Sequence, residues 1–534
     1  GSQPMHSSSG RFVVAFNGEI YNHKLIRTEL EKAGCNHWRG HSDTEVMLEA
    51  FEKWGVEQTV KRLIGMFAIA LWDRQERALF LIRDRIGEKP LYSGQVGAAF
   101  VFGSELKALK QYPGWHSEID RDSLTLFLRH NYIPAPYTIY KGVYKLLSGT
   151  ILSIQNGSME NPPVAYWSAK DMAEKGLANQ FAGSDNQAVQ RLDELLQNAI
   201  CQQMEADVPL GAFLSGGIDS STIVALMQAQ SSRPVKTFTI GFNEKDFNEA
   251  EHAKAVAVHL GTDHTELYVN PSDALDVIPK LPTVYDEPFS DSSQIPTFLI
   301  SQLTRQHVTV SLSGDAGDEL FGGYNRYFMG RSIWDKIGWM PGKVRRGLSK
   351  GLEVLSPAAW DNLFRGISPV LPKRMRQRTP GDKLHKLAEV LDVSDPMEMY
   401  QRLVSHWKVP QAIVQGGTEP LTCLTDKTQW INSDNFTHQM MYMDLVSYLP
   451  DDILVKVDRA AMGVSLETRV PFLDHRVVEF AWQLPLSMKI RHGQGKWLLR
   501  QVLYKYVPKE LIERPKVGFG VPIEIGRASC RERV

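Results

Sequence analysis

The chain has 534 residues, which at about 100 to 200 residues per domain predicts two to four domains. Its 60 lysines and arginines nearly balance 61 aspartates and glutamates, so no overall charge draws it to nucleic acid or to an anionic membrane. The hydrophobic share of 43% is typical of globular proteins, and no apolar run approaches the roughly 20 residues of a membrane span. We therefore expect a soluble globular protein that does not act on nucleic acid.

The cysteines favour a reducing, cytoplasmic setting. Cys35, Cys201, Cys423 and Cys530 are scattered, and no two have the spacing of a structural zinc site or a disulfide framework.

Both ends differ from the rest of the chain. The first six residues lack the basic and apolar regions of a signal peptide. Residues 525–534 (IGRASCRERV) lose all apolar periodicity, so we expect a non-native tail, with a genuine basic tail as the alternative. The sequence thus predicts that the natural protein extends beyond both ends.

The first half, residues 1–168, has the pattern of an α+β domain. Short β-rich runs at 12–16, 78–82 and 99–102 are separated by glycine and aspartate turns. Between them, apolar residues at helical spacing predict one helix that starts after Ser42 or Asp43 and ends at Gly55.

The second half, residues 186–524, is predicted to be an α/β domain. The polar segment 169–187 marks the boundary, and an amphipathic helix with apolar residues from Val189 to Ile200 follows it. A strand over 208–214, a helix over about 220–230 and a strand over 235–242 indicate a parallel sheet. Residues 333–440 have a helical pattern.

A serine- and glycine-rich loop between the first of these strands and the following helix predicts a phosphate site. Glycines let the backbone approach a ligand, hydroxyls donate hydrogen bonds, and a helix N-terminus favours an anion. The loop lacks the lysine of an ordinary P-loop and resembles the SGGxDS loop of ATP pyrophosphatases, which implies AMP-forming chemistry. A plain strand-to-helix turn is the alternative. The loop residues are Ser215, Gly216, Gly217, Asp219, Ser220 and Ser221.

A second loop, residues 313–319 (SGDAGDE), follows an apolar strand at 308–312. Its three carboxylates, Asp315, Asp318 and Glu319, would repel one another unless a cation lies close. Together with Asp219 they could hold Mg²⁺, although an aspartate- and glycine-rich loop is often just a solvated turn.

Five motifs together resemble those of glutamine-dependent asparagine synthetases, over residues 3–523. In chain order they are SGGIDSS (215–221), YDEPFSDSS (285–293), SGDAGDELFGGY (313–324), LETRVPFLD (466–474) and RPKVGFG (514–520). The resemblance implies that ATP activates the aspartate side chain as an acyl-adenylate with release of pyrophosphate. Ammonia then displaces AMP to give asparagine.

The resemblance also implies a role for each matching residue. The 215–221 loop would hold the pyrophosphate, with Asp219 and Asp318 on Mg²⁺. Lys516 would neutralise charge that develops on the phosphate, and Asp315 would accept a proton from the attacking ammonia. Asp315 and Ala316 depart from the Glu and Gly that are more usual there. Residues expected to pack around AMP are Leu214, Ile240, Ser313 and Gly314.

Two cations further along the chain have no settled role in this scheme. Lys456 and Arg459 could pair with the substrate carboxylate, or they could form structural salt bridges.

The first half resembles an Ntn-type class II glutamine amidotransferase domain. In the hexad NGEIYN (17–22), Asn17 and Gly18 would form an oxyanion hole, while Glu19 and Asp43 would orient glutamine. Asn-Gly alone is also a common hairpin turn. The family's nucleophile is an N-terminal cysteine, and no cysteine precedes Cys35. We therefore expect this chain to use ammonia and the natural full-length protein to use glutamine. Evolution away from glutaminase activity, as in β-lactam synthetases, is the alternative.

Other acceptors and functions remain open. The resemblance extends to enzymes that amidate sugar uronates for surface polysaccharides or close β-lactam rings, and a non-catalytic nucleotide-binding protein is a third possibility. The expected partners are aspartate, ATP with Mg²⁺, and glutamine or ammonia, with a second copy of the chain as a possible partner.

Overall fold

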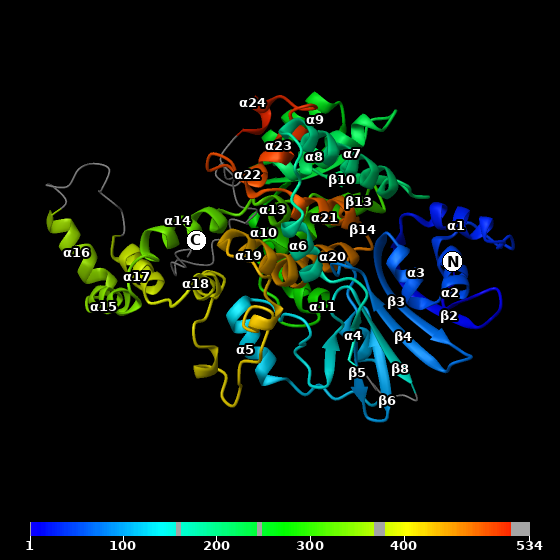
Figure 1. Ribbon diagram of the computed structural model, residues 1–534, viewed down its shortest axis with the longest axis horizontal. Coiled ribbons are helices and arrows are strands. Elements are labelled where there is room, and N and C mark those ends of the chain that lie inside the picture. Colours follow the sequence, from blue (N-terminus) through cyan, green and yellow to red (C-terminus); the bar gives the residue numbers. More distant parts are fainter. Residues whose placement is uncertain (1, 156–161, 243–247, 368–379, 514–534) are drawn as a thin grey trace.

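The computed structural model describes residues 2–155, 162–242, 248–367 and 380–513 (Figure 1). A six-stranded antiparallel sheet and a small three-stranded sheet belong to the first half of the chain, and a five-stranded parallel sheet belongs to the second. In the described part of the chain, no helix combines the length and the apolar content needed to cross a membrane.

The six-stranded sheet is the centre of the first half. Helices α1 (His23–Lys32) and α2 (Asp43–Trp54) pack against one face around Phe51, and Leu81 belongs to a second core on the opposite face. Its strands, in spatial order, are β1 (Met5–His6), β2 (Phe12–Ile20), β3 (Gly65–Asp73), β4 (Ala78–Arg83), β8 (Thr150–Gln155) and β9 (Val164–Ala165). The smaller sheet contains β6 (Ala99–Gly103), β5 (Tyr92–Val96) and β7 (Val143–Lys145).

The parallel sheet of the second half has the order β12-β11-β10-β13-β14, so its strand order reverses between β10 and β13. Its strands are β10 (Leu210–Phe213), β11 (Lys236–Phe242), β12 (Asp263–Val269), β13 (Val310–Leu312) and β14 (Glu467–Arg469). The surrounding helices include α7 (Asp185–Gln203), α8 (Ile218–Ala229), α9 (Ala250–Leu260), α12 (Gln294–Arg305), α20 (Leu454–Met462) and α23 (Trp497–Leu503).

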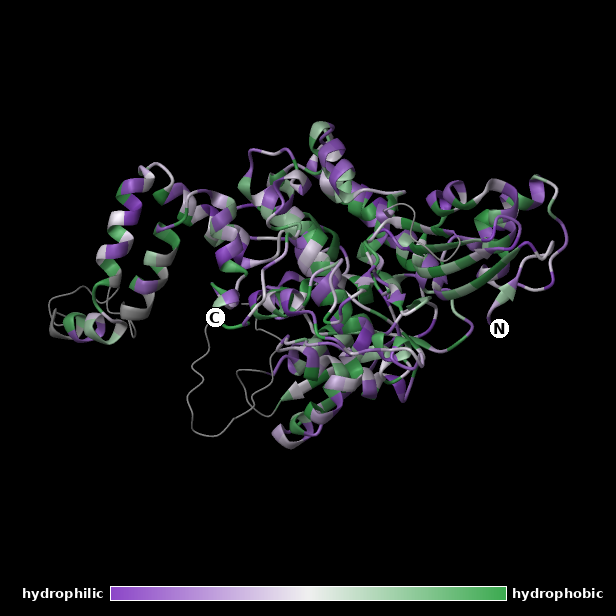
Figure 2. Ribbon diagram, turned by 90° about the horizontal axis from the view of Figure 1, so that it is seen from below, coloured by the Kyte–Doolittle hydropathy of each residue, from purple (hydrophilic) through white to green (hydrophobic). Residues whose placement is uncertain are grey.

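A helical arm extends from this body, at the left of Figure 1. Figure 2 shows polar and apolar residues alternating along its helices, whereas the strands at the opposite end of the molecule are largely apolar. The helices from the arm back to the body are α14 (Asn325–Ile337), α15 (Gly342–Glu353), α16 (Pro357–Ile367), α17 (Pro380–Leu391), α18 (Pro396–Leu403) and α19 (Phe436–Met443).

Most predicted elements are confirmed, with shifts of a few residues. The helix predicted over 220–230 begins two residues earlier, at Ile218, with Gly217 in an extended conformation as its N-cap. The strand predicted over 12–16 continues into the NGEIYN hexad, so Asn17 and Gly18 are not a hairpin turn: Asn17 to Ile20 belong to β2, paired with β3. Helix α6 (Ala169–Ala178) occupies the first part of the polar segment 169–187, which was expected to mark the domain boundary. Ser168 caps this helix, and Gly176 packs against Trp482.

Candidate functional site

The two predicted phosphate and metal loops meet at the reversal point of the parallel sheet. The first loop follows β10 and the second follows β13, and these strands are neighbours in parallel register, with Ala212 opposite Leu312. Ligands of open parallel sheets bind at the carboxyl ends of the strands where the strand order reverses. The topology therefore brings together residues that are about 100 positions apart.

The first loop is held open by its own hydroxyls. The Ser215 Oγ accepts from the Gly217 N–H at 3.3 Å and lies 2.9 Å from the Ser220 Oγ. Gly216 has φ +71°, and a Cβ there would lie 2.8 Å from the Ala253 N of α9, so only glycine fits. Gly217 then caps α8, whose N-terminus faces the loop. These features suit an anionic ligand.

The second loop lies directly against the first. A Cβ on Gly314 would be 2.7 Å from the Ser220 N, and one on Gly317 would be 2.2 Å from the Asp219 Oδ1. Ala316 adopts a left-handed conformation with φ +70°, which a glycine would adopt without strain. Because the two loops lie so close together, the Asp219 and Asp318 carboxylates contact the same cationic side chain.

That cation is Lys496, which the sequence analysis did not single out. Its Nζ lies 2.7 Å from the Asp318 Oδ1 and also contacts the Asp219 carboxylate. Burial opposes the charged form, but the two carboxylates together outweigh it and raise the pKa of Lys496. Gly323 makes room, because a Cβ there would lie 2.1 Å from the Lys496 Cε. In the sequence, Lys496 is marked only by its position at the end of a glycine-rich segment, GQGK (493–496), directly before helix α23.

A second group of carboxylates surrounds Lys456 beside the loops. The Lys456 Nζ lies 3.2 Å from the Asp291 Oδ2 and 2.8 Å from the Ser293 Oγ. Burial raises the pKa of Asp315, although the hydrogen bond from the Ser313 hydroxyl and the charge of Lys456 oppose it. A carboxyl group with a raised pKa next to a lysine is suited to proton transfer.

The remaining predicted residues of this half lie in different surroundings. Leu214 and Ile240 are buried, and the Leu214 N–H donates to the Phe238 O at 2.9 Å. Ser221 is fully buried in α8, so its hydroxyl does not face the loop surface. Lys516 lies outside the described residues.

The predicted glutamine residues gather at the end of β2. The Asn17 Nδ2 donates to the Ser104 Oγ at 3.0 Å, and a Cβ on Gly18 (φ +150°) would collide with the Met66 O at 2.0 Å. The Asp43 Oδ2 accepts from the Ile20 N–H at 2.9 Å, which joins the first turn of α2 to this strand.

Glu19 has an unusual ionisation. Burial, reinforced by the charge of Asp43 and opposed by that of Arg469, raises the pKa of Glu19 to about 7. Arg469 belongs to β14 in the parallel sheet and lies 3.5 Å from the Glu19 Oε2. The predicted glutamine residues therefore border the second half of the chain.

Buried ion pairs connect the two halves. The Lys89 Nζ lies 2.9 Å from the Asp458 Oδ1, and the Lys145 Nζ lies 2.7 Å from the Glu287 Oε1. Arg459, considered above for the substrate carboxylate, instead lies 3.0 Å from the Glu105 Oε1 of the first half. Lys456, by contrast, lies beside the candidate site.

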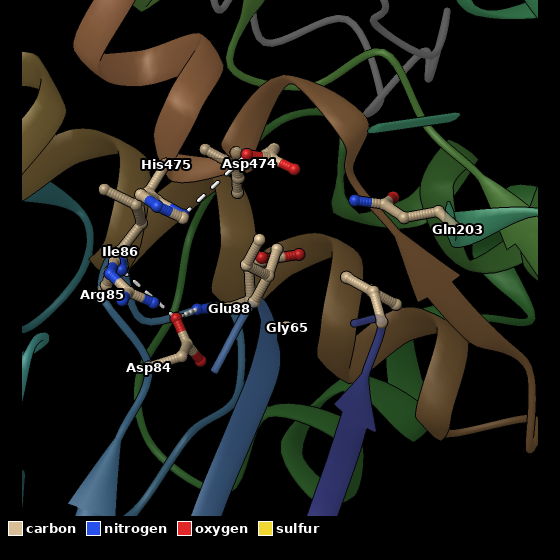
Figure 3. Close-up of a pocket in the computed structure, with 11 residues that line it drawn as sticks. Gly65, Asp84, Arg85, Ile86, Glu88, Gln203, Asp474 and His475 are labelled. Atoms are coloured by element: carbon tan, nitrogen blue, oxygen red, sulfur yellow. Dashed lines mark hydrogen bonds and ion pairs between the residues drawn. The ribbon is translucent and has the colours of Figure 1, made fainter. Parts of the chain in front are cut away.

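A small pocket lies between the halves (Figure 3). Tyr21, Gly65 and Glu88 come from the first half, whereas Gln203 and Asp474 come from the second. Figure 3 shows the Glu88 carboxylate among these side chains, with Gln203 on the opposite side of the pocket. A second pocket also includes Glu88 and continues toward Thr468 and Val470 of the parallel sheet.

Comparisons with known proteins agree with both halves of this description. Residues 191–534 match the family model "Asparagine synthase", and residues 1–167 match the "Glutamine amidotransferase domain". The chain is 34% identical over 520 residues to a putative glutamine-hydrolysing asparagine synthetase of Mycobacterium tuberculosis, covering 96% of this chain and 75% of the relative. It is 31% identical to glutamine-hydrolysing asparagine synthetase 1 of Bacillus subtilis, covering 98% of this chain and 78% of the relative.

Proposed function

The chain belongs to the asparagine synthase family of ATP-dependent, glutamine-using ligases, and from this premise we propose that it amidates the side chain of aspartate. ATP would activate the carboxylate as β-aspartyl-AMP with release of pyrophosphate, and ammonia would then displace AMP. We also propose that residues 1–168 and 186–524 form the two working domains. The observation that carries the proposal is the contact of Lys496 with the two loops, at the point where the strand order of the parallel sheet reverses.

The pyrophosphate would lie on the first loop. Hydrogen-bond donors for its oxygens would come from the Ser215 and Ser220 hydroxyls and from the N-terminus of α8. Asp219 is the one acidic residue in this loop. Lys496 would face the phosphates and stabilise the negative charge that grows as the bond to pyrophosphate breaks. The sequence resemblance gives this role to Lys516, so both lysines are candidates.

Asp219 and Asp318 fit a magnesium ion. Mg²⁺ bound with nucleotide phosphates commonly takes only one or two protein carboxylates, and these two already converge on one cationic group. In the described residues, no group of three or more His, Cys, Asp or Glu side chains gathers to hold a metal, which suits an ion held largely by the phosphates. The ion would neutralise phosphate charge.

Asp315 would receive the proton that ammonia loses when it attacks the acyl-adenylate. Its carboxyl is buried, it accepts a hydrogen bond from Ser313, and Lys456 lies within its electrostatic reach. In the glutamine half, Asn17 and Gly18 would stabilise the oxyanion of glutamine hydrolysis, while Glu19 and Asp43 would bind the α-ammonium group.

The test is product analysis with aspartate, ammonium, ATP and Mg²⁺. We expect equimolar AMP, pyrophosphate and asparagine, and we expect Asp219→Asn to lower the rate at least a hundredfold because it weakens the metal and lysine contacts. Release of ADP and phosphate would contradict the mechanism. A panel of sugar uronates and other carboxylates, scored by pyrophosphate release, identifies any acceptor that is used faster than aspartate.

A further inference from the structure

The helical arm carries the two most exposed large apolar side chains of the described part of the chain. They are Val354, with 79% of its surface exposed, and Trp339, with 77%, and they flank α15 at its two ends. Within the helix, Val344 and Leu348 are each 49% exposed and lie one turn apart, so they share one side of it. These four residues form the apolar stripe of the arm.

The packing of the arm leaves this stripe uncovered. Ser349 and Arg345 are buried: the Ser349 Oγ donates to the Ala388 O of α17 at 2.8 Å, and the Arg345 guanidinium lies 5.0 Å from the centre of the Trp334 ring. Each of these buried residues directly follows a residue of the stripe, and successive residues of an α-helix point about 100° apart. The arm therefore forms its own core with one side of α15 and leaves the neighbouring apolar side in water.

A basic stripe runs along the same helix. Lys343, Arg346 and Lys350 are exposed and lie three or four residues apart, so they share another side of α15. Among the side chains that the structure places, none of the three has a carboxylate partner. Residues 331–367 contain seven lysines and arginines but only three aspartates and glutamates, whereas the whole chain has 60 and 61. The positive charge is therefore a local property of the arm.

Two glycines separate the stripes. In an ideal helix, Gly347 and Gly351 lie between the basic and the apolar side of α15. Both are exposed, and nothing lies within 4 Å of a Cβ built on either. The solvent side of α15 thus runs from cations through bare backbone to apolar side chains, and a flat surface could approach the helix closely along its length.

This arrangement matches an anionic lipid surface. Amphipathic helices that lie in the membrane interface place apolar side chains at the acyl boundary and lysine or arginine among the headgroups, and tryptophan is favoured at that depth. A second copy of the arm would bring a basic stripe of the same sign. Nucleic acid would pair with the cations but would leave Val344 and Leu348 in water.

We propose that α15 is a docking surface for membranes that contain anionic lipids. Val344, Leu348 and Trp339 enter the interface, while the basic stripe binds lipid phosphates. The arm projects from the body that holds the two catalytic loops, so docking leaves those loops open (Figure 1). Binding is reversible, because a helix of 12 residues inserts only a few apolar side chains.

The test is co-sedimentation of the 534-residue chain with phosphatidylcholine vesicles, either pure or with about 30% phosphatidylserine. The anionic vesicles should bind most of the chain and the neutral vesicles little. Raising the salt from about 0.1 M to about 0.5 M should release the chain, because salt screens exposed charges. Equal binding to both vesicles, or binding to neither, would overturn the proposal.

Variants identify the two stripes. Lys343→Gln should lower the partition coefficient on anionic vesicles about fivefold, and Lys32→Gln, at an exposed position of α1, should leave it unchanged. Leu348→Ser should lower it at least about threefold, in contrast to Leu25→Ser, which removes an exposed leucine of α1. Thermal melting identifies a variant that fails to fold. An unchanged coefficient in either folded arm variant contradicts the docking surface.

Hydrogen exchange locates the contact. Anionic vesicles should slow amide exchange across residues 339–355 but not across α1. Slowing of the same residues without vesicles, as the protein concentration rises, would assign the stripes to a second copy. Slowing by duplex DNA but not by vesicles would assign them to nucleic acid, and either result contradicts the proposal.

This inference goes beyond the proposed function and does not depend on it. Vesicle binding is measured without substrates, so a chain that releases no pyrophosphate contradicts the proposed function and leaves the docking surface to be decided by the vesicles.

Discussion

At the scale of single residues, the candidate site depends on glycines that bring charged side chains together. The absence of a side chain at Gly317 leaves room for the Asp219 carboxylate, and Gly323 leaves room for both the Asp318 carboxylate and the stem of Lys496. A methyl group at either position would displace these side chains. The local spacing of glycines and aspartates predicted the two loops, but it gave no indication that Lys496, some 280 positions after Asp219, would join them.

The two lysine assignments can be compared directly. We expect Lys496→Met to lower kcat for pyrophosphate release by about a hundred- to a thousandfold, because a positioned charge at the phosphates is lost. If Lys516 instead stabilises the phosphate charge, as the family resemblance implies, Lys516→Met should lower kcat more than Lys496→Met does. Lys350→Met, at an exposed position on the arm, is the control, and steady-state kinetics measure all three.

Glu19 predicts how glutamine binding depends on pH. Its pKa of about 7 in the folded chain means that the carboxylate is mostly neutral at pH 6 and mostly charged at pH 7.5. Since the charged form attracts the α-ammonium group of glutamine, affinity should rise about eightfold over this interval. Isothermal titration calorimetry measures it. The Glu19→Gln variant should bind glutamine weakly, and its affinity should not rise with pH. An equally steep rise in that variant would show that another group causes the pH dependence.

At the scale of elements, caps and periodicity explain why the predicted helices are correct. The Ser42 Oγ accepts from the Glu45 N–H at the start of α2, and Gly55 ends that helix with φ +75°. The segment Asp444–Ile453 is different, because it is π-helical and contains Pro450. Within it, the Asp451 carboxylate accepts a hydrogen bond from the Ala135 N–H of the first half at 2.8 Å. Periodicity rules for α-helices do not predict such a segment.

Helix α15 of the arm gives a prediction about stability. Gly347 and Gly351 lie in its exposed part, and nothing lies within 4 Å of a Cβ built on either. Alanine should therefore stabilise the helix by about 0.5 to 1 kcal/mol per substitution, because the chain loses less backbone freedom on folding. Amide hydrogen exchange across residues 342–353 should slow several-fold. Gly314→Ala, at a crowded position, should instead destabilise the catalytic loops.

At the scale of the whole molecule, buried charges hold the halves together. Lys89 of the first half and Asp458 of the second half are both almost inaccessible to solvent. Without its partner, either charge would be buried and unpaired. The pair contributes less to net stability than to the relative position of the halves, because both charges lose their hydration.

Breaking this pair should be costly. Lys89→Met leaves Asp458 buried without its cation, and we expect a loss of about 3 kcal/mol, seen as a clear fall in the melting temperature. Lys61→Met, which breaks the exposed pair with Glu57, should cost less than about 1 kcal/mol. Equal effects of the two substitutions would show that the interface does not bury the Lys89 charge as described.

The sequence alone determined the local features: strands and helices with clear periodicity, the capped helix α2, the two loops with their glycines and carboxylates, and the glutamine motif. Each depends on residues within a few positions of one another, so spacing is sufficient to identify it. Only the tertiary structure decided that Lys496 bridges Asp219 and Asp318, that Arg459 joins the halves, and that Glu88 faces Gln203 across a pocket. These contacts join segments far apart in the chain, and the order of the sheet strands and the packing of the two halves bring them together.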